Sequence, residues 1–269
     1  MTVTNIRVPS RFRSSRKRGS NLAAPSVIAV IPARYGSTRL PAKPLAEIEG
    51  VPMVVRVWQQ TTQARSIDRT IVATDDERIA DVVRRAGGES MITAATHQSG
   101  SDRVAEVARR VDAEVYLNVQ GDLPFLNPAD LDGLAIPLRT DPSIAMATLG
   151  TPIVDQHEWT NPNVVKVVRG TQGNALYFSR ASIPYPRDAQ AIPSAALRHI
   201  GVYAYRREFL LKFAALPQGV LERIEKLEQL RALENGYTIR VVPSVAPSLE
   251  IDTAEDLVRA RAQASSARR

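Results

Sequence analysis

The sequence predicts an α/β protein built on a mostly parallel, doubly wound sheet. Short apolar runs rich in Val and Ile have the composition of strands that are buried on both faces. Segments with helical patterning separate these runs, and this alternation indicates a parallel sheet. Right-handed crossovers then place the loops that follow the strands at one edge, where ligands bind in such sheets.

The first strand is expected to begin at Val27, where β-branched residues lead into a polar loop. Further strands are expected at 69–74, 114–119, 144–152, 163–169, 175–179 and 237–243. The stretch 183–194 contains three prolines and is expected to be a mobile loop.

Helices are expected at 53–65, 77–86, 102–111 and 221–235. Gly87-Gly88 should stop the second of these, and Gly236 should end the fourth as a C′ glycine. Thr253 is expected to cap a last helix, with Asp256 at the acidic position of a capping box.

The formal charge of +7 lies mainly in an N-terminal extension. Residues 1–26 contain six Lys or Arg and no acid, which leaves 29 bases against 28 acids in the rest of the chain. We therefore expect a disordered basic tail at 1–24, a single domain at 25–262 and a short tail at 263–269. An organelle transit peptide has a similar composition. The near-neutral domain argues against a nucleic-acid partner.

Other classes are excluded by what the sequence lacks. There is no cysteine, so disulfides, thiol catalysis and Cys-based zinc sites are excluded. No apolar run approaches the roughly 20 residues that span a bilayer. Both observations agree with a cytoplasmic protein that has no membrane partner.

A cationic loop follows directly on the first strand. It contains Arg34, Arg39 and Lys43, with the small residues of 36–38, among them Ser37, between the first two. Guanidinium groups match phosphate oxygens, and the small residues let backbone N–H groups approach an anion. The loop has neither the Walker A ending nor the three glycines of the dinucleotide fingerprint. A triphosphate site is favoured over an ordinary basic surface loop.

Two carboxylates are candidates for a magnesium site. Asp122 follows the strand at 114–119, and Asp252 comes just before the cap of the last helix. Hard oxygen ligands suit Mg²⁺, and substrate phosphates can complete its coordination. The alternatives are a turn aspartate for Asp122 and helix-terminus electrostatics for Asp252. The sequence alone does not show that the two side chains meet.

Three later segments carry polar side chains that are candidates for binding a small polar ligand. Arg180 and His199 are able to bind a carboxylate, whereas Tyr203, Glu228 and Gln229 are able to bind hydroxyl groups. The alternatives are packed strand residues for the tyrosine and a surface ion pair for Glu228.

The motifs resemble one enzyme family throughout. Residues 32–45 have the sequence Pro-Ala-Arg-Tyr-Gly-Ser-Thr-Arg-Leu-Pro-Ala-Lys-Pro-Leu, which is similar to the N-terminal signature of the 3-deoxy-manno-octulosonate (KDO) cytidylyltransferases, or CMP-KDO synthetases. The related CMP-sialic acid synthetases have a Gly-Gly-Ser-Lys style loop here instead. The remaining family motifs follow in order at 97–103, 121–122, 179–180, 198–203, 227–231 and 252–253. The resemblance extends from about Val27 to Leu257.

The resemblance implies a Rossmann-like nucleotidyltransferase fold with a lobe inserted near 143–235 for sugar binding and homodimer formation. It implies that a cytoplasmic enzyme activates KDO with CTP, as part of lipopolysaccharide precursor synthesis. Lys43, Asp122 and Asp252 are then catalytic, and the two aspartates hold Mg²⁺. The implied substrate-binding residues are Arg34, Ser37, Arg39, Lys43, Ser99, Arg103, Gln120, Arg180, His199, Tyr203, Glu228 and Gln229.

Two positions depart from the family pattern. Leu123 stands where many members have Glu, and Glu250 replaces a Gly. Neither change removes a proposed ligand, but both bear on metal geometry and on the choice of sugar. Two alternatives therefore stay open: a cytidylyltransferase for a related sugar acid such as 8-amino-KDO, and a nucleotide-binding regulator without catalysis.

Overall fold

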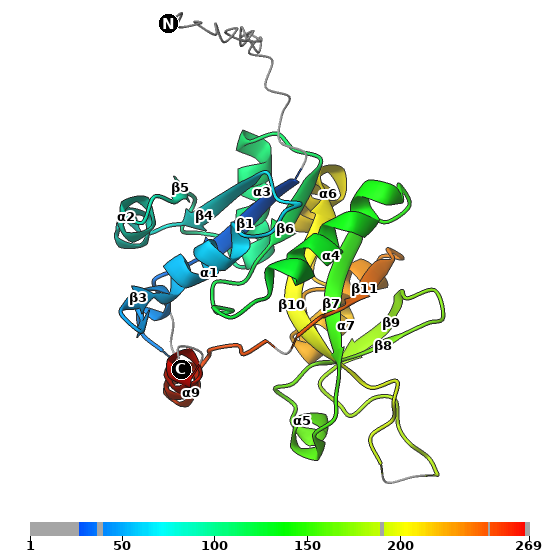
Figure 1. Cartoon of the computed structure of the whole chain (residues 1–269). Coiled ribbons are helices and arrows are strands. Elements are labelled where there is room, and N and C mark those ends of the chain that lie inside the picture. Colours follow the sequence, from blue (N-terminus) through cyan, green and yellow to red (C-terminus); the bar gives the residue numbers. More distant parts are fainter. Residues whose placement is uncertain (1–26, 37–39, 189–190, 247, 267–269) are drawn as a thin grey trace, which may run out of the picture.

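The computed structural model describes residues 27–36, 40–188, 191–246 and 248–266. Its centre is a nine-stranded mixed sheet, in which seven strands follow the order β11-β7-β10-β6-β1-β4-β5 (Figure 1). The bounds of these seven, in that order, are Ile239–Pro243, Met146–Pro152, Leu197–Arg206, Val115–Asn118, Val27–Ala33, Arg69–Thr74 and Glu89–Ile92. The strands β8 (Lys166–Arg169) and β9 (Ala175–Ser179) extend the sheet beside β10.

The parallel half of the sheet is formed by β6, β1, β4 and β5, of which the first three were predicted from the sequence. The β1 strand is almost entirely buried, and its side chains alternate between two apolar cores. Ala29 and Ile31 belong to one core, whereas Ile28 and Val30 belong to the other. This fully buried strand therefore fixes the position of the loop that follows it.

Helices cover both faces of the sheet (Figure 1). One face is covered by α1 (Met53–Thr61), α2 (Glu77–Arg85) and α4 (Pro128–Thr140). The other is covered by α3 (Gly100–Arg110) and α6 (Arg207–Ala215). A sheet with helices on both faces is the doubly wound arrangement that the sequence predicts.

Within the path of seven strands, β10 runs against the other six. The β10 strand pairs antiparallel with both β6 and β7, and its register with β7 shifts between Ile200 and Tyr203. The sequence analysis did not predict a strand across the whole of this segment. The strand joins the parallel half to the region that contains β7, β8, β9 and β11.

The predicted element boundaries agree closely in several places. The β4 and β9 strands have the predicted bounds, and α2 ends at Arg85, before Gly87 with its φ of +84°. Helix α1 ends at Thr61 instead of residue 65. The sequence analysis did not predict β5, α4, α6, the short helices η1 (Lys43–Leu45) and α5 (Gln156–Thr160), or the hairpin of β2 (Glu47–Ile48) and β3 (Val51–Pro52).

The single helix predicted at 221–235 is wrong. The segment instead forms α7 (Val220–Glu225) and α8 (Leu230–Glu234), and Lys226 adopts a left-handed φ of +56° between them. A buried ion pair between Glu222 and Arg231 joins the two helices. Since Leu227 also turns into the core, tertiary burial overrides a pattern that suits one continuous helix.

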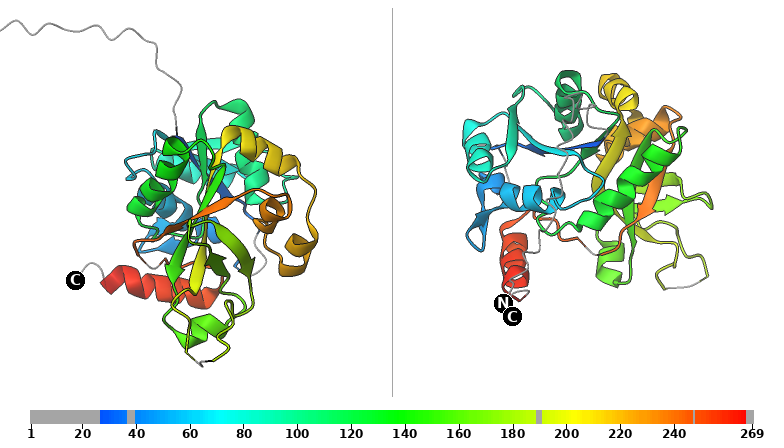
Figure 2. Two further views of the ribbon diagram at one scale, coloured as in Figure 1. Left: turned by 90° about the vertical axis from the view of Figure 1, so that its right-hand side faces the viewer. Right: turned by 45° about the horizontal axis from the view of Figure 1, so that its top comes forward.

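The last helix, α9 (Ala254–Ser266), stands apart from the sheet layers in Figure 2 and packs on the β2–β3 hairpin. Its capping box is confirmed, because Asp256 accepts the backbone N–H of Thr253 at 2.9 Å and Thr253 Oγ1 accepts that of Asp256 at 3.2 Å. The helix continues to Ser266, beyond the boundary expected at 262. Its apolar side chains bury Ile48, Met53 and Ile251, which holds the 250–252 segment against the start of α1.

The other expectations concern the ends of the chain and one loop. The basic tail at 1–24 lies outside the described residues. Within the described parts of 180–196, no residue belongs to a helix or a strand. None of the described helices combines the length and the apolar character that a membrane span needs.

The buried pair between α7 and α8 generates a prediction about stability. We expect Arg231→Met to lower the free energy of unfolding by about 3 kcal/mol, because it leaves the Glu222 carboxylate buried without its partner. The measurement is urea unfolding at neutral pH.

A matched control is Arg259→Met, which removes an exposed guanidinium paired with Asp256 and should cost less than about 1 kcal/mol. Equal losses in the two variants would contradict a special role for the buried pair.

Candidate active site

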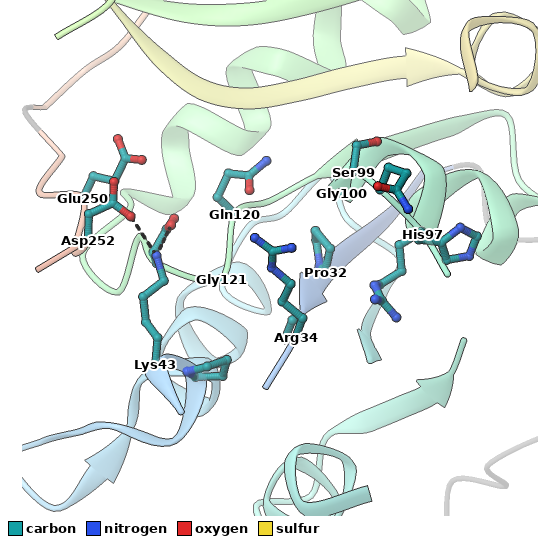
Figure 3. A pocket seen from close by; sticks show the side chains of 15 residues that line it. Pro32, Arg34, Lys43, His97, Ser99, Gly100, Gln120, Gly121, Glu250 and Asp252 are labelled. Carbon is teal, nitrogen blue, oxygen red and sulfur yellow. Dashed lines mark hydrogen bonds and ion pairs between the residues drawn. The ribbon is translucent and has the colours of Figure 1, made fainter. Parts of the chain in front are cut away.

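A cleft of about 360 Å³ opens at the carboxyl ends of β1 and β6 (Figure 3). It lies at the edge of the sheet that the parallel strand pattern predicts for a ligand site. Its walls come from the loops after β1 and β6, the start of α3 and the segment before α9. The lining residues are Pro32, Ala33, Arg34, Lys43, Pro44, His97, Gln98, Ser99, Gly100, Arg103, Gln120, Gly121, Asp122, Glu250 and Asp252.

Gly121 allows the loops after β1 and β6 to approach each other closely. A Cβ atom at this position would lie 3.2 Å from the backbone oxygen of Pro32, which is a tight contact with an immobile atom. The glycine therefore brings Asp122 to the same end of the cleft as the segment after β1.

The two predicted metal-binding aspartates come together on Lys43, whose ion pair with Asp252 is seen in Figure 3. The Lys43 Nζ donates to Asp122 Oδ2 at 2.7 Å and to Asp252 Oδ1 at 3.0 Å. A backbone hydrogen bond from Ile251 N to Asp122 O, at 3.0 Å, holds the two acidic segments side by side. The three proposed catalytic side chains thus share one end of the cleft.

The two aspartates keep Lys43 positively charged. Burial alone would lower the pKa of its ammonium group, but Asp122 and Asp252 outweigh that effect and raise the pKa above its ordinary value. The ammonium group is therefore a fixed positive charge at neutral pH.

Glu250 adds a third carboxylate to this end of the cleft. One carboxylate oxygen from each of Asp122, Glu250 and Asp252 lies within 4.8 Å of the others, and we call these three residues the acid cluster. The Glu250 residue is exposed by surface area, yet the cleft walls displace water from its carboxyl, and this effect together with the charges of Asp122 and Asp252 raises its pKa to about 7. In the sequence, Glu250 was recognised only as a departure from the family pattern. Its spacing of two from Asp252 could have indicated its role, because side chains two residues apart share one side where the backbone is extended.

The acid cluster fits a hard divalent cation. Its donors are all carboxylate oxygens, which is the chemistry that Mg²⁺ prefers. Asp122 Oδ1 is buried and has no hydrogen-bond partner among the described residues, which indicates an oxygen that an additional ligand would satisfy. The lysine ammonium group shows that a positive charge is stable there.

The opposite end of the cleft is formed by the first turn of α3. Ser99 caps this helix and exchanges hydrogen bonds with Asp102 in a capping box. The Arg103 side chain is buried, where it donates to Thr93 Oγ1 at 2.5 Å and pairs with Asp75 at 3.2 Å. Of the predicted substrate-binding residues, Ser99, Arg103 and Gln120 therefore line the same cleft as Arg34 and Lys43.

A second group of predicted residues gathers behind this cleft. Tyr203, on β10, donates its hydroxyl to Gln229 Oε1 at 3.1 Å. The neighbouring Glu228 accepts from Ser101 Oγ at 2.7 Å and lines a cavity of about 630 Å³, which shares Gln98 and Ser99 with the first cleft. The break between α7 and α8 thus places Glu228 and Gln229 against β10 and α3.

Two polar atoms of this group are buried without a hydrogen bond. Neither Glu228 Oε1 nor Gln229 Nε2 has such a partner among the described residues, although Arg231 lies 3.7 Å from the former. Burial raises the pKa of Glu228, and its hydrogen bond from Ser101 acts in the opposite direction. Unsatisfied buried polar atoms are rare in proteins and indicate a place where a polar ligand can bind.

His199 lies next to Tyr203 on β10. Its Nε2 is 2.9 Å from Thr148 Oγ1, whose own hydroxyl proton is directed to the carbonyl of Val202 at 2.8 Å. Nε2 therefore carries a proton, and the neutral ring packs edge-on against Phe178. Burial lowers the pKa of His199 to about 3.

Of the described site residues that were predicted, Arg180, His199, Tyr203 and Gln229 line neither of the two cavities. The Arg180 guanidinium donates to the carbonyls of Glu225 at 2.7 Å and Pro162 at 3.0 Å. Ser37 and Arg39 lie outside the described residues.

Comparisons with known proteins agree with the motif resemblance. A family model described as cytidylyltransferase matches residues 28–239. A 3-deoxy-manno-octulosonate cytidylyltransferase from Syntrophotalea carbinolica is 55% identical over 244 residues, which cover 88% of this chain and 98% of that protein. A protein of the same name from Trichlorobacter lovleyi is 49% identical, over 87% of this chain and 97% of its own length.

Solved structures of cytidylyltransferases are also similar to this chain. A CMP:2-keto-3-deoxy-manno-octonic acid synthetase complexed with CTP matches with a TM-score of 0.86 and 42% identity, over 90% of this chain and 99% of its own. A 4-diphosphocytidyl-2C-methyl-D-erythritol synthase from Anaerococcus prevotii matches with a TM-score of 0.61, over 89% of this chain and 98% of its own. At 15% identity, this second match shows the fold alone.

The neutral, half-buried His199 predicts a loss of stability in mild acid. The unfolded chain takes up a proton as the pH falls below about 6.5, whereas folded His199 stays neutral until the pH approaches 3. When the pH falls from 6 to 4.5, the unfolding free energy of the wild type should drop by about 1–2 kcal/mol more than that of His199→Gln. Urea unfolding at the two pH values measures this difference.

The control is His157→Gln, which makes the same substitution at an exposed position. A His199→Gln variant with the same slope as the wild type would contradict the prediction.

Proposed function

The chain belongs to the 3-deoxy-manno-octulosonate cytidylyltransferase family, and from this premise we propose that it transfers a cytidylyl group from CTP to KDO. The anomeric hydroxyl oxygen would attack the α-phosphorus, the bond to the leaving pyrophosphate would break, and the hydroxyl would lose its proton. The products are CMP-KDO and pyrophosphate. The observation that carries the proposal is the meeting of Lys43, Asp122 and Asp252 at one end of the cleft.

The metal of this reaction is proposed to be Mg²⁺. Asp122 and Asp252 would hold it, and Glu250 is close enough to contribute. When bound, the ion would neutralise phosphate charge and lower the pKa of the attacking hydroxyl.

The protein's own cations are proposed to hold the triphosphate and the departing pyrophosphate. Arg34 and Lys43 line the cleft, and the proposal extends to Ser37 and Arg39 of the same loop. Because phosphoryl-type transfer depends mainly on positioning and on charge stabilisation, fixed cations are sufficient tools. Ser99, Arg103 and Gln120 would contact the rest of the nucleotide.

The sugar acid is proposed to bind beside His199, Tyr203, Glu228 and Gln229. The buried, unsatisfied atoms of Glu228 and Gln229 support this, because sugar hydroxyls would supply the missing hydrogen bonds. For Arg180, the proposed contact with the sugar carboxylate requires the guanidinium to leave the carbonyls of Pro162 and Glu225.

We also propose that the enzyme is a cytoplasmic homodimer that serves lipopolysaccharide precursor synthesis, with an interface on the 143–235 lobe. Two large apolar side chains of this lobe, Leu176 and Ile224, are 66% and 72% exposed, which supports an interface there. The alternative substrate is a related sugar acid such as 8-amino-KDO. A regulator without catalysis is less well supported, since the acid cluster and Lys43 are both present.

Asp122 provides the direct test of the proposed reaction. We expect Asp122→Asn to reduce magnesium-dependent pyrophosphate release from CTP and KDO by at least about a hundredfold, because it weakens the charge stabilisation of the transition state. The control is Asp155→Asn, in an exposed N-cap of α5, which should change the rate by less than about twofold. An Asp122→Asn enzyme with near-wild-type rates would contradict the assigned role.

The identity of the sugar needs a separate test. Pyrophosphate release is measured for wild-type enzyme with CTP and a panel of sugar acids that includes KDO and 8-amino-KDO. We expect the highest kcat/KM with KDO, because Glu228 and Tyr203 offer oxygen partners to neutral hydroxyl groups. A clear preference for the amino sugar would establish the alternative substrate.

A further inference from the structure

We propose that Lys43 is the resting counter-cation of the acid cluster, and that its ammonium group opposes metal binding until nucleotide phosphates draw it away. The proposal takes the identities of the metal and the nucleotide from the proposed function. It adds that the two ligands assist each other's binding through one side chain of this protein.

The ammonium group of Lys43 lies among the carboxylates of the acid cluster. Lys43 Nζ lies 2.7 Å from Asp122 Oδ2 and 3.0 Å from Asp252 Oδ1, so it uses oxygens of the same two carboxylates that would ligate a metal. The third carboxylate, from Glu250, has an oxygen within 4.8 Å of the other two. An ammonium group and a divalent cation inside a cluster of this size would repel each other strongly.

In the described part of the chain, the ammonium group leaves one carboxylate oxygen of the acid cluster without a hydrogen bond. Asp122 Oδ1 is buried without a hydrogen-bond partner among the described residues, while Oδ2 of the same group accepts from Lys43. The ammonium group therefore leaves this oxygen of the acid cluster unsatisfied. A divalent cation would use the remaining oxygen, but only where the lysine charge does not compete with it.

The ammonium group of Lys43 is able to move toward phosphates bound in the same cleft. Lys43 lies in the short helix η1 at the wall of the cleft, and its flexible four-carbon stem allows the charge to shift while the backbone stays in place. Arg34 lines the same cleft at the end of β1, so phosphates bound there would lie within the space that Lys43 also lines (Figure 3). Transfer of the ammonium group to the phosphates would leave the acid cluster to the metal.

In this arrangement, Lys43 couples the binding of the metal to the binding of the nucleotide phosphates. Phosphate binding removes the competitor of the metal, and metal binding releases Lys43 for the phosphates. By linkage, each ligand strengthens the other by the same factor, for which values between about 5 and 150 are typical. A static structural role for Lys43 would give no such coupling.

The experiment measures metal binding to the protein without nucleotide or sugar. Free Mn²⁺ is followed by electron paramagnetic resonance during titration of the wild type, Lys43→Met and Lys43→Arg. We expect Lys43→Met to bind Mn²⁺ at least about tenfold more tightly than the wild type, because the competing charge is gone. Lys43→Arg keeps the charge and should bind as weakly as the wild type.

Two controls locate the effect. Arg34→Met removes a positive charge from the same cleft and should change the Mn²⁺ affinity much less than Lys43→Met does. The double variant Lys43→Met with Asp122→Asn should lose the gained affinity. Lys43→Gln provides a second neutral side chain, and circular dichroism during urea unfolding establishes that each variant is folded.

The proposal is overturned if folded Lys43→Met and Lys43→Gln bind Mn²⁺ no more tightly than the wild type. It is also overturned if Arg34→Met has an equal effect, or if the gain survives the loss of the Asp122 carboxylate. Because no CTP or KDO is present, these outcomes are separate from a failure of the proposed reaction, which would be seen as missing pyrophosphate release by the wild type.

Discussion

The ion pairs of Lys43 with Asp122 and Asp252 are the interaction on which the candidate site depends. They join segments that are 79 and 209 residues apart in the sequence, and each segment is fixed by a different part of the fold. The β1 strand positions the cationic loop, β6 and Gly121 position Asp122, and α9 holds the segment of Asp252 against the start of α1. Like charges that would repel one another are stable together because the lysine lies between them.

The cleft with Arg34 and Lys43 at the carboxyl ends of β1 and β6 was predictable from the sequence. Fixed cations that directly follow a buried strand favour an anion-binding loop over an ordinary basic surface loop. The parallel pattern indicates which edge of the sheet the loops share. The meeting of Asp122 with Asp252 was not predictable from residue patterns alone, because it depends on how α9 packs on the β2–β3 hairpin. That step came from the family resemblance, and the structure places the two carboxylates on one ammonium group.

The second group of residues was less predictable, for physical reasons that differ from one residue to the next. The amphipathic pattern at 221–235 suits a single helix, and only the burial of Leu227 and the pair of Glu222 with Arg231 shows why the chain turns at Lys226. The strand β10 mixes aromatic, charged and small residues because its two ends contact different surroundings. Arg180 shows the opposite case, in which a plausible ligand residue binds backbone carbonyls of its own chain.

The antiparallel strand β10 has a mechanical consequence. It is hydrogen-bonded to β6 on one side and to β7 on the other, so one continuous backbone links the nucleotide end to the region around His199 and Tyr203. A jaw-like rotation of the two halves would therefore have to break the central ladder of the sheet. Movements of side chains and surface segments leave this ladder intact, and the proposed displacement of Lys43 is a movement of that kind.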